Sequence, residues 1–299
     1  MEQTRQQTGL RLGLISLGLV SVLFLGVFLF GPKSTAPESQ NAPTAQPVSL
    51  LSVLDEPATR TAVEALRAVS PTTFAELETA AAFAHADGAP PEDLARLTLE
   101  ALFSQFQDQA FAMRASNSTS YQAIITGLAD GLSQLKATKS DWCEGPAIAA
   151  FLTQNEDELV PALLSEFSYG SPQYDWAMVW MTTVLSAAKQ GQDRPRRYQR
   201  PGARDEAILQ EEGLALGSEQ WALALQIAAF ANSEGTSYGQ MQEVIASMDV
   251  CDLGIAVNMV SERLPSEVRA RIWADLLPEI MLGNTPYVMW RVTDYFFIG

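Results

Sequence analysis

The chain has 299 residues, a length that suits one large domain or two small ones. It is acidic, with 35 aspartates and glutamates against 19 lysines and arginines and a net charge of -16 at pH 7. This balance argues against a nucleic-acid partner, because a general nucleic-acid binder needs surplus lysine and arginine to displace counterions from phosphates.

The first predicted element is a membrane helix. No charged residue interrupts the apolar run from Leu12 to Phe30. As a helix this run would extend about 28 Å, close to the thickness of the hydrocarbon core of a bilayer. We therefore predict a transmembrane signal-anchor helix over residues 12–31. A cleaved signal peptide is the alternative, although its apolar region is usually shorter, about 7–15 residues.

The charges beside this run predict its orientation. Arg5 and Arg11 precede it and only Lys33 follows closely, so the positive-inside rule places residues 1–11 in the cytoplasm. Abundant alanine and arginine are typical of a GC-rich bacterial genome. We expect a single-pass protein of the bacterial inner membrane with its C-terminal domain in the periplasm. The inverted orientation, with that domain in the cytosol, is the alternative.

A flexible linker and a helical domain follow. Residues 32–48 are rich in proline, serine and alanine and have too little apolar surface to pack. Residues 49–299 show helical periodicity and almost no strand pattern. The predicted fold class is therefore all-α, with a single N-terminal transmembrane helix, a flexible linker and a multi-helix globular domain of about ten helices.

Four stretches carry the clearest helical patterns. Residues 173–189 are apolar nearly all round, which predicts a buried central helix, and 93–113 and 218–232 are similar. Residues 265–282 carry an apolar stripe at every fourth position. Two hydroxyl-rich points, Ser70-Pro71 and Ser118 to Ser120, predict helix starts with a side-chain cap.

A weak internal repeat suggests two related helical modules. An apolar helix, a polar break and a Thr-Ser-Tyr triplet end at Tyr121, and the same order ends at Tyr238. Each copy is followed by an aspartate-x-cysteine stretch. The corresponding sub-modules are 56–190 and 205–299. The alternative is coincidence, because any helical protein repeats helices and caps.

The two cysteines, Cys143 and Cys251, predict a structural disulfide. Two distant cysteines and one histidine, His85, cannot form an ordinary zinc site, so we expect no metal and no cofactor. Neighbouring carboxylates disfavour a reactive thiolate. An even cysteine count in an oxidising compartment favours a Cys143–Cys251 bond. Two buried free thiols are the alternative.

A basic loop stands out in this acidic chain. Five arginines occur within residues 193–204 with no acid among them after Asp193, and two prolines and a glycine break any helix there. One hypothesis is that the loop contacts an anionic partner, with Tyr198 able to stack. The alternative is a solvated loop held against the acidic surface of the protein itself. The predicted contact residues are Arg194, Arg196, Arg197, Tyr198, Arg200 and Arg204.

The aromatic C-terminal stretch 284–299 fits either a docking tail or, as we expect, a last element packed in the core.

The pairs Ser133/Lys136 and Ser186/Lys189 have the serine–lysine spacing of penicillin-recognising enzymes, but no Lys-Thr-Gly sequence accompanies them. We therefore predict no catalytic residues.

The preferred hypothesis is a non-catalytic, membrane-anchored binding or scaffold protein of the bacterial cell envelope, with another envelope protein as partner. The alternative is a hydrolase that acts on cell-wall glycan or peptide through carboxylates that the sequence does not identify.

Overall fold

The computed structural model describes residues 49–138, 143–146, 167–217, 219, 222, 246–282 and 284–297. The predicted membrane helix, the linker and most of the helix predicted over 218–232 lie outside these ranges. No helix within the described ranges has both the length and the apolar character needed to span a bilayer.

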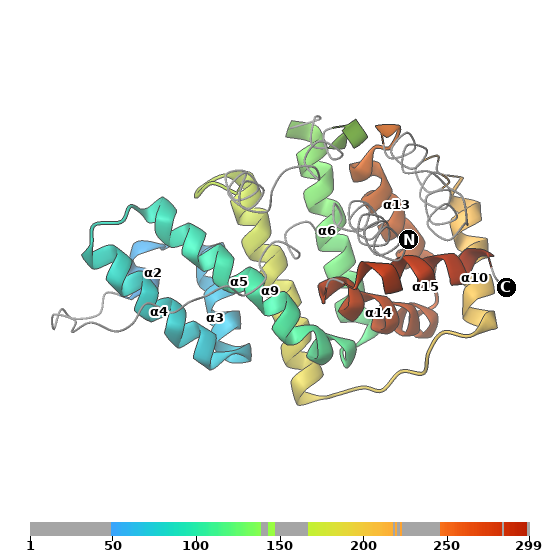
Figure 1. Cartoon of the computed structure of the whole chain (residues 1–299), viewed down its shortest axis with the longest axis horizontal. Helices are drawn as coiled ribbons and strands as arrows, with labels where there is room; N and C mark the ends of the chain where they lie inside the picture. The colour runs from blue at the N-terminus through green and yellow to red at the C-terminus, as the bar shows by residue number, and fades with distance from the viewer. Residues whose placement is uncertain are drawn as a thin grey trace, which may run out of the picture.

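The described ranges form ten helices and no strand, so the prediction of an all-α domain is confirmed. Figure 1 shows α2, α3 and α4 at one end and α10, α13, α14 and α15 at the other, with α6 and α9 between them. The helices are α2 (Leu50–Val53), α3 (Pro57–Val69), α4 (Pro71–Ala86), α5 (Pro91–Arg114), α6 (Ser118–Thr138), α9 (Pro172–Asp193), α10 (Ala203–Leu216), α13 (Val250–Arg263), α14 (Ser266–Met281) and α15 (Thr285–Phe297).

Helix α9 is the central helix that the sequence predicts. It packs against α3, α5 and α6, and its buried residues, which include Tyr174, Met178 and Leu185, lie on several sides of the helix. A helix that is apolar nearly all round can bury all of these faces at once. Helix α9 thus joins α3 to α5 and α6, and the helices at the other end attach through α5 and α6, because α14 packs on both and α13 packs on α6.

The helix starts follow the sequence signals, with two differences in the caps. Ser70 is the N-cap residue of α4 and Pro71 opens the helix, but the Ser70 hydroxyl contacts the Thr73 hydroxyl instead of a backbone N–H. At α6 the cap is Asn117, whose Oδ1 accepts the backbone N–H of Ser120 at 2.8 Å. Asparagine caps a helix as well as serine does, so the predicted cap is one residue too late.

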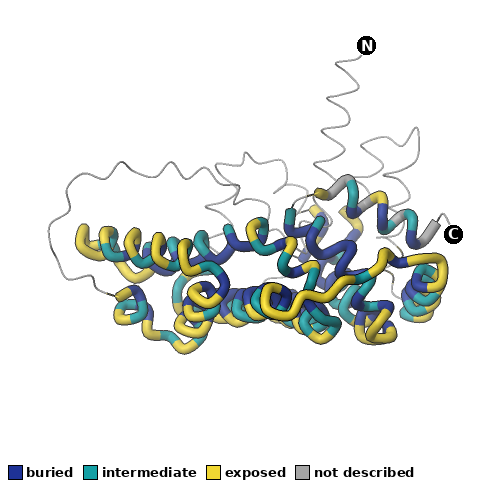
Figure 2. Tube along the Cα trace, turned by 90° about the horizontal axis from the view of Figure 1, so that it is seen from below, coloured by how far each residue is buried: buried dark blue, intermediate teal, exposed yellow. Residues whose placement is uncertain are grey.

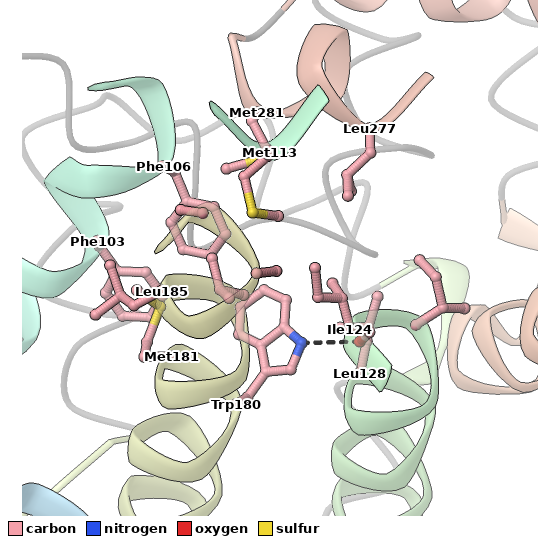
Figure 3. Close-up of a cluster of buried hydrophobic side chains, with 14 of the residues drawn as sticks. Phe103, Phe106, Met113, Ile124, Leu128, Trp180, Met181, Leu185, Leu277 and Met281 are labelled. Carbon is pink, nitrogen blue, oxygen red and sulfur yellow. Dashed lines mark hydrogen bonds between the residues drawn. The ribbon is translucent and has the colours of Figure 1, made fainter. Parts of the chain in front are cut away.

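Two tryptophans of α9 pack against α6 and bond to its backbone. Trp180 Nε1 donates to the Ile124 carbonyl at 3.0 Å, the bond drawn in Figure 3. Trp176 Nε1 donates to the Gly127 carbonyl at 2.7 Å, and the two indoles stack with centroids 5.6 Å apart. Gly131 leaves the space for Trp176, because a Cβ at that position would lie 2.0 Å from the indole Cε2.

One hydrophobic cluster runs through the described helices. In Figure 3, Phe106 and Met113 of α5 meet Leu277 and Met281 of α14 beside Trp180. The cluster therefore draws buried side chains from both of the predicted ranges 56–190 and 205–299. The repeated copy that ends at Tyr238 lies outside the described residues, so duplication stays a prediction.

The C-terminal stretch forms a last helix, α15, on the core. Val288 and Tyr295 are buried, and Tyr295 Oη donates to Asp275 Oδ2 at 2.8 Å. Trp290 alone among the described aromatic residues of α15 is substantially exposed. The expectation of a packed last element is confirmed for these residues.

The predicted disulfide is present, and it ties the segment after α6 to the first turn of α13. The Cα atoms of Cys143 and Cys251 lie 5.1 Å apart, within the range of disulfides, and both residues are buried. Lys136 Nζ lies 2.8 Å from Asp249 Oδ2 and 2.6 Å from Asp252 Oδ1. Lys136 therefore offsets the negative charge of two carboxylates that flank the disulfide. Its hydrogen bonds to Asp249 and Asp252 raise the pKa of the lysine.

Candidate anion-binding surface

The basic loop forms an extended connection between α9 and α10, here called the arginine strap (residues 194–202). It runs along the lower edge of the molecule in Figure 1, and Figure 2, which looks onto that edge, shows most of it exposed. Helix α9 ends at Asp193, and Pro195 and Pro201 keep the strap extended because proline lacks a backbone donor and fixes φ.

Backbone and tyrosine contacts anchor the strap to the turn between α5 and α6. The Arg196 backbone N–H donates to the Ala115 carbonyl at 2.9 Å. The Tyr198 hydroxyl donates to the Ser116 carbonyl at 2.9 Å, and its ring lies 6.2 Å from that of Tyr121. These bonds satisfy carbonyls beyond the C-terminus of α5, while the arginines of the strap stay exposed.

Tyr198 is therefore placed as an anchor. It is half-buried against the core, and burial raises the pKa of its hydroxyl even though the nearby Arg196 guanidinium acts in the opposite direction. A ring held in this way forms part of the wall of both hollows, and its stacking on a ligand stays a prediction.

The arginines themselves are exposed and carry no ion pair to any acid in the described ranges. This holds for Arg194, Arg196, Arg197, Arg200 and Arg204. The alternative of a loop neutralised by the acidic surface of the protein gains no support from these residues. Arg196 interacts with the Tyr198 hydroxyl and Arg204 lies near Asp205, but exposed guanidinium groups without an ion pair can still engage an external anion.

Two adjoining hollows flank the strap. The first has a volume of ≈ 330 Å³ and lies between the strap, the last turn of α5 and the middle of α14. The second, of ≈ 530 Å³, shares Arg196, Arg197 and Arg271 with the first and reaches Glu267. Both are open to solvent. The first is lined by Phe111, Arg114, Ala115, Arg196, Arg197, Tyr198, Gln199, Arg200, Arg271, Ala274 and Asp275.

Arg271 fixes one wall of both hollows. Its Nε and Nη2 bind the two oxygens of Asp205 at 2.8 and 2.7 Å, so the pair is bidentate. These hydrogen bonds hold the pKa of the Asp205 carboxyl below its usual range. Asp205 Oδ2 also accepts the backbone N–H of Gly202 at 3.3 Å, which couples the end of the strap to α14.

Asp275 is the acid of the first hollow, and its oxygens are fully engaged. Its carboxylate accepts hydrogen bonds from Arg291 Nε and Tyr295 Oη, each at 2.8 Å, and from Tyr287 Oη at 3.1 Å. Arg291 also pairs with Asp294. Arg291 therefore offsets only part of the negative charge of Asp275, because its single positive charge is shared with Asp294.

The structure adds residues that the sequence analysis missed. Phe111, Arg114 and Arg271 line the first hollow beside the strap, and Phe111 is 68% exposed. Phe111 lies in the stretch 93–113 that the sequence predicts to be buried nearly all round, and its exposure departs from that expectation because the rotation of α5 turns this ring away from the core. Arg204, by contrast, belongs to the first turn of α10 and does not line either hollow.

Neither serine–lysine pair is arranged for catalysis. The Ser133 hydroxyl donates to the Ala129 carbonyl, and Lys136 binds the two aspartates beside the disulfide. In the second pair, Lys189 is bound to Asp193. A lysine held by a carboxylate is a poor base for a serine hydroxyl, so both pairs are explained as ordinary helix surface.

Comparisons with protein-family models, with curated protein sequences and with solved structures gave no significant match.

Proposed function

We propose that this chain is a non-catalytic binding or scaffold protein, anchored in the bacterial inner membrane, whose periplasmic helical domain holds an anionic envelope partner on the arginine strap. The observation that carries the proposal is the set of exposed strap arginines that have no acid partner among the described residues. The anchor, its orientation and the envelope location of the partner are expected from the sequence patterns of residues 1–48.

The strap suits binding because it is both exposed and held in place. The Arg196 backbone is bound to Ala115 and the Tyr198 side chain to Ser116, so a ligand does not have to order the whole loop. The acids of the two hollows give no support to the hydrolase alternative, since Asp275 is hydrogen-bonded to Arg291 and Tyr295 and Glu267 is exposed.

The test measures binding of the full-length protein, in neutral lipid nanodiscs, to a short fluorescein-labelled glutamate peptide. Replacing all five arginines of the predicted contact by serine should weaken binding by about tenfold or more, because several exposed charges act together. Binding should also weaken as salt is added.

A matched pair of double variants controls for net charge. Arg197→Ser with Arg200→Ser changes the strap, whereas Arg60→Ser with Arg67→Ser removes the same charge from α3. Only the strap pair should reduce the affinity. Equal losses from the two pairs would show a general charge effect and contradict the proposal.

A further inference from the structure

The first hollow combines positive charge with an exposed aromatic ring. Phe111 and Arg114 lie three residues apart on the last turns of α5, so their side chains share one face of the helix. Arg197 and Arg200 bring further charge to the same hollow from the strap. Arginine next to an aromatic ring is the composition of energetically important positions in protein–protein interfaces.

The size of the positive region limits the ligand to a short one. The net charge of the chain is -16 even with the strap included, so the remainder of the chain carries an excess of negative charge. Charges interact strongly only within about 8–10 Å at physiological salt. A short anion on the strap therefore meets local positive charge, whereas an extended polyanion or an anionic membrane also faces the net negative charge of the rest of the chain.

The hollows are open, which favours a segment of a larger partner over an enclosed small molecule. Binding sites for small molecules are usually mostly apolar and bury most of the ligand. Here Arg196, Arg197, Tyr198, Gln199 and Arg271 line both hollows, so a chain segment could cross the strap and contact both. Glu267, at the edge of the second hollow, would repel acidic groups placed there.

We propose that the first hollow binds a short acidic segment of a protein partner in which a large apolar residue stands next to the acidic ones. The apolar side chain packs on Phe111. The carboxylates of the segment pair with arginines that surround this ring, namely Arg114, Arg196, Arg197 and Arg200. This inference rests on the proposed function and adds the chemistry of the partner segment.

The test uses three blocked, labelled peptides and the full-length protein. The first peptide contains glutamates around a central leucine, the second has serine in place of the leucine, and the third has glutamines in place of the glutamates. The first should bind about tenfold more tightly than the second, because only its leucine can bury apolar surface on Phe111. The third should show no measurable binding.

Phe111→Ser separates this inference from the proposed function. The variant should lower affinity for the leucine peptide to that for the serine peptide, while the affinity for the serine peptide stays unchanged. Phe83→Ser is the control, because Phe83 of α4 is another exposed aromatic residue, with an exposed fraction of 52%. It should change the affinity for neither peptide. Phe111 is exposed, so its replacement should leave the fold intact, which circular dichroism would check.

Each of the other possible results overturns either the proposed function or the inference about the partner segment. If both acidic peptides bind equally and Phe111→Ser changes nothing, the apolar component is wrong and the proposed function stands. If the five-arginine variant binds both peptides as well as wild type, both proposals fail. If strap-dependent binding appears only with phosphatidylglycerol vesicles and not with the peptides, the partner is a membrane surface and the inference of a protein segment is overturned.

Discussion

At the scale of single residues, the pair formed by Asp205 and Arg271 fixes the geometry of the candidate site. Both oxygens of Asp205 are bound by one guanidinium, and Asp205 also caps the backbone at Gly202. Asp205 is 7% exposed, so its carboxylate has exchanged most of its water for these partners. A charge held in this way is costly to leave unpaired.

This arrangement predicts a pH-dependent stability. Because the folded-state pKa of Asp205 is lowered, the pair contributes stability above the ordinary carboxyl pKa, and the contribution is lost as pH falls through the folded-state value. Asp205→Asn should lower the free energy of unfolding by about 1–3 kcal/mol near neutral pH.

The measurement is urea denaturation of wild type and Asp205→Asn at several pH values. The difference between the two proteins should shrink below about pH 4, where Asp205 of the unfolded wild-type chain becomes protonated. A difference that stayed constant across this range would show that the charge of Asp205 contributes nothing.

At the scale of elements, the contact between α6 and α9 depends on two glycines and two tryptophans. The indoles bond to carbonyls of α6 at Ile124 and Gly127, which brings α9 against the backbone of its neighbour. Helices can approach this closely where one of them lacks side-chain atoms at the contact.

Gly131→Ala should therefore destabilise the domain by about 1–3 kcal/mol. The new Cβ would lie 2.0 Å from Trp176 Cε2, so the indole must move and lose its bond to the Gly127 carbonyl. Alanine has the better helix propensity by about 1 kcal/mol, which offsets only part of this cost.

Gly127→Ala is the matched control. It makes the same change on the same helix, but its Cβ would lie 3.0 Å from Trp180 Cδ1, a milder overlap. Urea denaturation followed by tryptophan fluorescence should rank wild type and Gly127→Ala above Gly131→Ala. Stability of Gly131→Ala equal to or above that of wild type would contradict the packing argument.

At the scale of the whole molecule, the Cys143–Cys251 bond joins positions 108 residues apart. A cross-link over such a loop removes many conformations from the unfolded chain. The bond lies beside the Lys136 ion pairs, so the α6–α13 contact is held both covalently and by charge.

Removing the bond should lower the free energy of unfolding by about 2–5 kcal/mol. Denaturation with and without reductant measures this effect, and Cys143→Ser with Cys251→Ser provides the bond-free reference, in which reductant should change nothing. Native protein purified without reductant should contain no alkylatable thiol. Two alkylatable thiols would contradict both the bond and the oxidising compartment proposed for the domain.

The sequence by itself determined the features that depend on local signals or on simple counting. Helical periodicity and the proline at position 71 identified helices such as α4 and α9, because amphipathic patterns and caps act within a few residues. The chain has only two cysteines, so a disulfide within one chain had a single choice of partners. The arginine cluster could also be identified from the sequence, because its members are neighbours along the chain.

Only the tertiary structure decided which side chains meet at the candidate site. Phe111 and Arg271 are distant from the strap in sequence, and they reach it because α5 and α14 pack together beneath it. Packing likewise turned Tyr198 inward and left Phe111 exposed. The physical reason is that the rotation of a helix and the course of a strap are set by the burial of many side chains at once, which no short stretch of sequence encodes.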